Sequence, residues 1–253
     1  VVEVLGDPLA PKAFSLIAIH KYGIPNRFAQ EVLKGAEEAA KLPLSEDKRE
    51  DLRDVPIFAI DPADARDFDD AVFARRQDKG WRLIVAIADV ASYVKPGSEL
   101  DSEAVQRSTS VYFPGRVVPM LPEALSNGLC SLKPAEERLC LACEMTIGDN
   151  GKVQRSRFVA ALMKSAARLT YDQVAEYYAS GVLKHHDTLK GVKRNLDDLH
   201  GLYKALRAAR EKRGAIDFES TEYGFQFDQR GAVAGLVLRE RNDAHKLIEE
   251  CMI

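Results

Sequence analysis

Two tight turns constrain the fold of this chain most, because each one separates two apolar runs of strand length. The turns are residues 78–80 (Asp-Lys-Gly) and 149–151 (Asp-Asn-Gly). Such turns between strand-like segments are typical of β-hairpins. The sequence therefore predicts hairpins over 71–76 with 82–90 and over 139–147 with 153–163. A further hairpin is predicted over 224–227 with 232–239. A short apolar run, 57–60, predicts a buried strand just before the first hairpin.

Helical periodicity alternates with these hairpins. Apolar residues recur at three- and four-residue steps along 185–212, which is the stripe of a long helix that ends near Gly214. Shorter helices are predicted over 11–22, over 27–41, over 101–107 with Asp101 as N-cap, over 171–179 with Thr170 as N-cap, and from 243 to the last residue. Residues 109–135 contain four prolines and are expected to form a long loop. The combination predicts a mixed α+β fold with antiparallel-rich sheets flanked by helices.

Composition excludes several classes of protein. Apolar residues make up 46% of the 253 residues and charged residues 30%, a balance typical of a folded chain rather than a disordered one. No apolar run reaches the roughly 18 residues needed to cross a membrane, so no membrane partner is expected. The net charge is −3, so a nucleic acid would have to bind a local basic surface. Four cysteines without a secretion signal predict reduced thiols and a cytoplasmic location.

The chemically most informative segment is residues 61–70, DPADARDFDD, which places five aspartates within ten residues directly after the predicted buried strand. Two carboxylates about 4 Å apart repel by roughly 4 kcal/mol at an effective dielectric constant of 20, so converging acids need a proton or a cation. Hard divalent ions such as Mg²⁺ prefer carboxylate oxygens and can activate water for phosphoryl displacement. From spacing alone, a hydrated acidic loop is an equal alternative.

Other motifs fit this segment less well. A calcium loop requires glycine at its sixth position, where counting from Asp61 gives Arg66. An aspartyl-phosphate enzyme places Asp-x-Asp directly after a strand, whereas several residues separate the strand from Asp67. Neither G-x-x-x-x-G-K-[ST] nor G-x-G-x-x-G occurs in the chain, so no nucleotide cofactor is predicted. Cys140 and Cys143 form a lone C-x-x-C inside a predicted strand and are expected to be structural.

Several long motifs together resemble the RNB catalytic domain of the ribonuclease II/ribonuclease R exoribonuclease family, and within it the bacterial ribonuclease R branch. They occur in the family's order and the resemblance extends from Val1 to Ile253. The motifs are DPADARDFDDAV, WRLIVAIADVASYVKPGSELDSEA, TSVYFPGRVVPMLPEALSNGLCSL and RNDAHKLIEECMI. The resemblance implies a processive 3′→5′ exoribonuclease that hydrolyses single-stranded RNA to nucleoside 5′-monophosphates.

The resemblance also assigns roles to the aspartates. The family holds Mg²⁺, as one or two ions with Mn²⁺ as an alternative, on four aspartates that match Asp61, Asp67, Asp69 and Asp70. The third of the four is needed for cleavage but not for RNA binding, which implies a catalytic role for Asp69. Asp61, Asp67 and Asp70 are then the metal ligands. Asp64 falls outside this set and is expected to be structural.

Aromatic residues next to a cation suit single-stranded RNA, because base stacking contributes about 1–3 kcal/mol per base and tolerates any sequence. Tyr112 has Phe113 beside it and Arg116 nearby, although without the resemblance a buried aromatic pair is the favoured interpretation. The resemblance implies that Tyr112 stacks on the terminal bases and that Phe218 holds the strand from the other side. A basic stretch from residue 152 to 168 is as compatible with a phosphate-binding patch as with a hydrated face.

The last helix carries His245 and Glu249 one turn apart, a spacing that serves either a metal or an ordinary i,i+4 pair. Because the family has this motif near its active region, Asn242, His245 and Glu249 are expected to neighbour the site.

Both ends of the sequence are expected to be internal to a longer chain. Residues 1–8 would be the tail of a preceding OB or cold-shock-type domain, 9–54 a helical lead-in, and 55–253 the N-terminal part of the RNB domain. The family's catalytic arginine lies in the second half of that domain, so this piece alone is expected to cleave poorly or not at all. The alternative function is a non-catalytic RNA-binding module with the same fold, and no protein partner is predicted.

Overall fold

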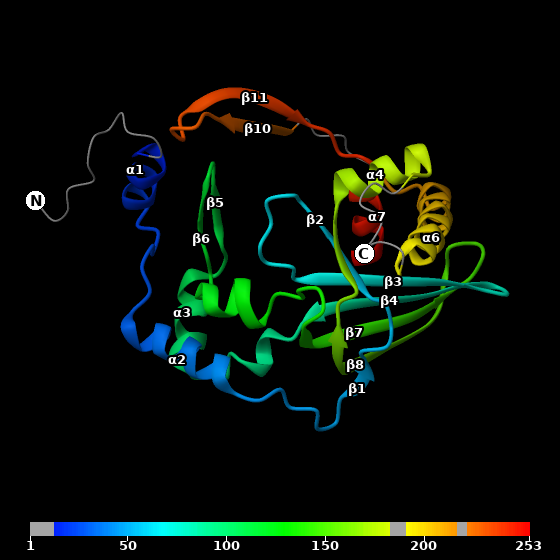
Figure 1. Cartoon of the computed structure of the whole chain (residues 1–253), viewed down its shortest axis with the longest axis horizontal. Coiled ribbons are helices and arrows are strands. Elements are labelled where there is room, and N and C mark those ends of the chain that lie inside the picture. The colour runs from blue at the N-terminus through cyan, green and yellow to red at the C-terminus, as the bar shows by residue number, and fades with distance from the viewer. Residues whose placement is uncertain (1–12, 183–190, 217–221) are drawn as a thin grey trace, which may run out of the picture. The chain divides into compact units, whose positions relative to one another are not determined.

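A computed structural model describes residues 13–182, 191–216 and 222–253 (Figure 1). The contacts divide these residues into two compact units that alternate along the chain. Unit one contains residues 13–42, 93–126 and 222–240, and unit two contains residues 43–92, 127–182, 191–216 and 241–253.

Unit two is built on a seven-stranded sheet with the strand order β1-β8-β7-β4-β3-β2-β9. The strands are β1 (Glu50–Leu52), β2 (Phe58–Asp61), β3 (Asp70–Gln77), β4 (Gly80–Ala88), β7 (Glu137–Ile147), β8 (Val153–Lys164) and β9 (Ala167–Thr170). The four central pairings are antiparallel, and the two edge pairings, β1 with β8 and β2 with β9, are parallel.

Three helices pack on one side of this sheet (Figure 1). They are α4 (Tyr171–Ser180), α6 (Lys193–Lys212) and α7 (Asp243–Met252). The apolar stripe of α6 and the buried face of α7 pack with side chains of β2, β3 and β4 in one hydrophobic core, in which Phe58, Leu196, Leu199 and Leu247 are fully buried. The core therefore holds the ends of β2 and β3 in fixed positions.

Unit one contains three helices and two β-ribbons. The helices are α1 (Ala13–Lys21), α2 (Gln30–Lys41) and α3 (Glu99–Arg107), and the ribbons pair β5 (Val111–Phe113) with β6 (Arg116–Val118) and β10 (Glu222–Phe227) with β11 (Val233–Arg239). Arg107 connects the segments, because its guanidinium donates hydrogen bonds to the carbonyls of Pro25, Arg27 and Pro119 and lies 3.7 Å from the ring centroid of Phe28. Short irregular turns occupy Val90–Ser92, as a 3₁₀ turn in unit two, and Ala124–Leu129, as a π-helical turn.

The predicted α+β class is confirmed, together with the three hairpins and most of the helices. Thr170 caps α4 as predicted, in a reciprocal capping box with Gln173. Residues 1–8, predicted as the tail of a preceding domain, lie outside the described residues. The described part of the chain contains no helix long and apolar enough to span a membrane.

Three predictions of local structure are wrong. The N-cap of α3 is Ser98 rather than Asp101, because the Ser98 hydroxyl accepts from the backbone N–H of Asp101 and the helix already begins at Glu99. Within the expected loop 109–135, the Pro114-Gly115 turn allows β5 and β6 to pair. The long helix, predicted over 185–212, begins at Lys193 because residues 191–192 form a turn; residues 185–190 lie outside the described residues.

Candidate functional site

The aspartates lie where β2 ends and β3 begins, at the edge of the buried sheet. Asp61 is the last residue of β2 and is only 8% exposed, and Asp70 is the first residue of β3 and is half-buried. Residues 62–69 connect them without regular structure and are called the acidic loop. The backbone carbonyl of Asp69 accepts a hydrogen bond from the N–H of Ala88, at the end of β4, which fixes the far end of the loop.

The carboxylates of this segment interact electrostatically. Burial raises the pKa of Asp61 to about 7, and the negative charges of Asp70, Asp69 and Asp67 contribute to this rise, against the opposing effect of Arg168. Partial loss of solvent around the carboxylate raises the pKa of Asp69 to about 6, and repulsion from Asp67 and Asp70 contributes to this rise. The residue as a whole is exposed. Burial also raises the pKa of Asp70. The four residues Asp61, Asp67, Asp69 and Asp70 are called the aspartate cluster.

The cluster has the donor chemistry of a site for a hard divalent cation. The Oδ2 atom of Asp61 is buried and has no hydrogen-bond partner among the described residues. A buried carboxylate oxygen without a donor is costly unless a proton or cation approaches it. Among the residues that the structure describes, however, no three His, Cys, Asp or Glu side chains are already grouped closely enough to hold a metal ion. The side chains would have to draw together around an ion.

Helix α7 contacts Tyr171, whose backbone follows the Asp61–Thr170 pair of β2 and β9. Asn242 caps α7 by accepting the N–H groups of Ala244 and His245, and its Oδ1 also lies 2.8 Å from Nδ1 of His245. The His245 ring stacks on the ring of Tyr171, with centroids 3.9 Å apart. Glu249 is held by the guanidinium of Arg241. Of the three expected neighbours of the site, Asn242 thus caps α7, His245 stacks on Tyr171, and Glu249 forms an ion pair with Arg241.

Tyr171 itself is a site residue that sequence reasoning missed. Burial raises its pKa to about 12, and the charges of Asp70, Asp61 and Glu249 contribute to this. Its position follows from the register, because Asp61 pairs with Thr170 across the parallel strands β2 and β9. The sequence showed only the capping signal before Tyr171, and the pairing that brings it to Asp61 joins segments far apart in the chain.

The predicted RNA-binding residues that the structure describes belong to unit one. Tyr112 and Arg116 lie in the ribbon β5–β6, and Tyr112 is 68% exposed. Tyr112 pairs with Val117 and Phe113 pairs with Arg116. Because paired residues share a face, Arg116 extends on the Phe113 face, away from Tyr112. Phe218 lies outside the described residues.

Two arginines of the basic stretch after residue 151 are engaged within the protein. Arg157 on β8 forms ion pairs with Glu50 and Glu144, and Arg168 on β9 donates to backbone carbonyls of the acidic loop. These two arginines are therefore not a free phosphate-binding surface. The lone C-x-x-C is not a chelating pair either: Cys140 is buried, Cys143 is half-buried and both are free thiols.

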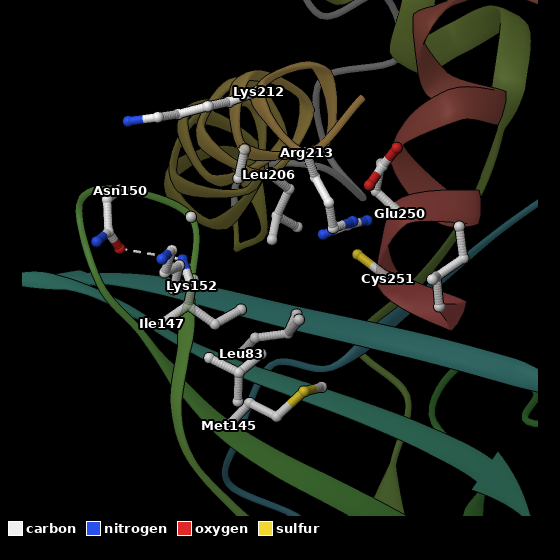
Figure 2. A pocket seen from close by; sticks show the side chains of 14 residues that line it. Leu83, Met145, Ile147, Asn150, Lys152, Leu206, Lys212, Arg213, Glu250 and Cys251 are labelled. Carbon is white, nitrogen blue, oxygen red and sulfur yellow. Dashed lines mark hydrogen bonds between the residues drawn. The ribbon is translucent and has the colours of Figure 1, made fainter. Parts of the chain in front are cut away.

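A cavity of about 700 Å³ lies in unit two, and no residue of the aspartate cluster lines it (Figure 2). Leu83, Met145 and Ile147 form its floor on the sheet, and Leu206 lines it from α6. Figure 2 shows Glu250 and Cys251 of α7 on the far side. The lining contains none of the residues predicted for the site, and its floor is apolar.

Comparisons with known proteins agree with the fold. Residues 49–253 match the family model described as RNB domain. Ribonuclease R of Vibrio parahaemolyticus is 48% identical over 260 residues, a match that covers 100% of this chain and 30% of the relative. The chain thus spans under a third of that curated relative.

Solved structures give the same result. Mycoplasma genitalium RNase R in complex with ribose methylated single-stranded RNA superimposes with a TM-score of 0.91 at 32% identity, covering 99% of this chain and 39% of that one. The same protein in complex with double-stranded RNA gives a TM-score of 0.92 at 32% identity, covering 99% of this chain and 45% of that one.

Proposed function

Because this chain belongs to the RNB-domain family, we propose that it is the part of a 3′→5′ exoribonuclease that carries the metal-binding aspartates. The protein would hydrolyse single-stranded RNA processively and release nucleoside 5′-monophosphates, as part of RNA turnover in the cytoplasm. The observation that carries the proposal is the buried Oδ2 of Asp61, which has no hydrogen-bond partner among the described residues and stands at the end of β2, where the acidic loop begins. The raised pKa values of Asp61, Asp69 and Asp70 support it.

The aspartates divide into ligands and a base. Asp61, Asp67 and Asp70 would hold Mg²⁺, as one or two ions, with Mn²⁺ as an alternative. When bound, such an ion stabilises negative charge on the phosphate and on the leaving 3′ oxygen and lowers the pKa of a bound water. The orphan Oδ2 of Asp61 supports this role, because its burial without a donor is relieved by a cation.

Asp69 would orient the attacking water and accept its proton. A carboxylate with a pKa of about 6 is a stronger base than an ordinary aspartate and is still mostly ionised at pH 7, which suits general-base catalysis near neutral pH. Its exposure leaves it accessible to water and substrate, whereas Asp61 is buried.

RNA binding would depend on stacking and backbone contacts rather than on base identity. Tyr112 offers an exposed ring for the terminal bases, and Phe218 would hold the strand from the other side. Contacts to the ribose 2′-OH would select RNA over DNA.

The test uses full-length protein with RNA labelled at either end, with and without Mg²⁺. We expect a 3′ label to be released at once as a mononucleotide and a 5′ label to remain on a shrinking strand, both only with Mg²⁺. Asp69→Asn should slow cleavage at least about 100-fold while RNA affinity stays within about twofold. Asp64→Asn, an exposed acid in the same loop, is the matched control and should cleave normally.

The same experiment distinguishes the exoribonuclease from the non-catalytic alternative. A wild-type protein that binds RNA but cleaves neither label, or an Asp69→Asn variant that behaves as wild type in every assay, would support an RNA-binding module instead.

A further inference from the structure

The acidic loop lacks the regular backbone hydrogen bonding of a helix or a strand. Within residues 62–69, the internal backbone hydrogen bond is a single turn from the N–H of Ala65 to the carbonyl of Pro62. Segments with so few backbone hydrogen bonds open readily unless side chains from other elements hold them. A site of several carboxylates nevertheless needs its groups placed to within about 0.5 Å. Other residues must therefore fix this loop.

Ser131 holds the loop on both sides of Asp67. Its side chain is completely buried, and its Oγ accepts a hydrogen bond of 3.1 Å from the N–H of Phe68. The same hydroxyl donates a hydrogen bond of 3.1 Å to the carbonyl of Arg66. The next residue, Leu132, donates its N–H to the carbonyl of Phe68 at 2.8 Å. The peptide groups that flank Asp67 are thus bound to one short segment after Cys130.

Arg168 holds the beginning and the end of the loop together. It lies on β9, paired with Ala59 of β2, and its Nη2 donates to the carbonyls of Pro62 at 2.6 Å and Ala63 at 3.0 Å. Its guanidinium also lies 5.3 Å from the centroid of the Phe68 ring. One planar, permanently charged group therefore contacts both ends of the segment that carries the acids.

An RNA-binding role for Arg168 is the competing interpretation, because arginine is the usual partner of phosphate. The geometry disfavours it. Nη2 is already occupied by two carbonyls, and Nε is shielded from solvent with no partner among the described residues. The guanidinium is directed into the loop, where its charge also acts on Asp61.

We propose that Arg168 and Ser131 are positioning residues that clamp the backbone of residues 62–69, so that Asp67 and Asp69 stay near enough to Asp61 and Asp70 for the side chains to draw together when a cation binds. The proposal rests on the proposed function for the role of the aspartates, whereas the clamp is a property of the folded chain by itself. Neither residue would touch substrate.

The test compares Arg168→Gln, Arg168→Lys and Ser131→Ala in the full-length protein. Three quantities are measured: deuterium uptake of a peptide covering 62–69 without metal, Mn²⁺ affinity from the free-Mn²⁺ EPR signal, and kcat and KM on single-stranded RNA. For Arg168→Gln we expect faster exchange in 62–69 and unchanged exchange in 139–147. Mn²⁺ affinity and kcat should each fall about 10- to 100-fold, with KM within about twofold.

Graded rescue distinguishes positioning from general destabilisation. Arg168→Lys keeps the charge but not the planar fork, so its Mn²⁺ affinity should lie between those of wild type and Arg168→Gln. Ser131→Ala should act in the same direction. Arg194→Gln, the same substitution at an exposed position of α6, is the matched control and should resemble wild type in all three measurements.

The outcomes separate this inference from the proposed function. Wild-type Mn²⁺ affinity and wild-type loop exchange in Arg168→Gln and Ser131→Ala would overturn the clamp. If Arg168→Gln fails to fold, Arg168→Lys and Ser131→Ala decide by the same criteria. If wild-type protein neither binds Mn²⁺ nor cleaves RNA, the proposed function is refuted, and loop exchange alone still decides whether the clamp exists.

Discussion

The ionised form of Asp61 is disfavoured by its surroundings in the folded protein. It lies at the end of a buried strand, with one oxygen lacking a donor among the described residues, and the charges of other carboxylates act on it. Without a cation, protonation is the means by which such a group avoids the cost of burial and repulsion. The native metal-free protein therefore holds a proton on Asp61 at pH values where the unfolded chain has released it.

This makes the stability of the metal-free protein depend on pH. Because the pKa of Asp61 is about 7 in the folded state and near 3.8 in the unfolded state, its contribution to the free energy of unfolding falls as pH rises from about 4 to about 7. At pH 7.5 in EDTA, Asp61→Asn should raise the free energy of unfolding by about 1–3 kcal/mol, after allowance for solvent screening. Urea unfolding at pH 5 and at pH 7.5 measures the difference.

Asp64→Asn is the control for that measurement, since Asp64 is exposed in the same loop. It should leave the pH dependence unchanged. An Asp61→Asn variant with the same loss of stability between pH 5 and pH 7.5 as the parent protein would show that Asp61 is not the group responsible.

For single side chains, the sequence showed which acids matter but not what surrounds them. Five aspartates in ten residues indicate carboxylate chemistry by spacing alone. Tyr171, Arg168 and Ser131 could not be identified that way, because they lie far along the chain and reach the cluster only through the folding of distant segments against it. The roles assigned to the aspartates, to Tyr112 and to Phe218 remain predictions.

Among the secondary-structure elements, the β7–β8 turn and helix α6 approach each other closely at Gly151. Gly151 closes this turn with a φ of +70°, and a Cβ atom there would lie 2.2 Å from the carbonyl oxygen of Ala205 in α6. Both the backbone conformation and the close approach require glycine. The hairpin and the helix therefore depend on each other through one residue.

Gly151→Ala should destabilise the protein by about 3 kcal/mol, because the left-handed conformation costs roughly 1–2 kcal/mol and displacement of the helix adds roughly 1–3 kcal/mol. Gly214, just after α6, has a φ of +75°, and a Cβ atom added there would meet no other part of the described chain within 4 Å. Gly214→Ala should thus cost only about 1 kcal/mol. Equal losses for the two variants in urea unfolding would contradict the close contact at Gly151.

Elements formed by local signals were the predictable ones. Tight turns and capping residues identified the hairpins and α4 directly from the sequence. Pairings of distant segments were not predictable, since neither β1 nor β9 carries any local sign of its partner. The ribbon β5–β6 was missed because the prolines within and after it suggested a loop, although Pro114-Gly115 is a suitable hairpin turn.

At the scale of the whole molecule, the share of its relatives that this chain covers bears on its expected cleavage rate. It covers 30% of ribonuclease R of Vibrio parahaemolyticus. We expect the 253-residue chain alone to cleave RNA about 100- to 1,000-fold more slowly than full-length protein, because a transition-state donor implied by the family resemblance is not among its assigned residues. Cleavage of 5′-labelled RNA by both proteins at equal concentration measures this, and comparable rates would contradict it.

The parallel edge strands have a consequence for synthesis on the ribosome. The parallel partners of residues 50–52 and 58–61 are residues 161–163 and 167–170, which are synthesised about 110 positions later. At ordinary translation speeds that interval lasts roughly 5–20 s. During it the nascent chain already contains every acid of the cluster but not Arg168 or Tyr171. The aspartate cluster therefore gains its contacts with Arg168 and Tyr171 only after most of this region has emerged from the exit tunnel.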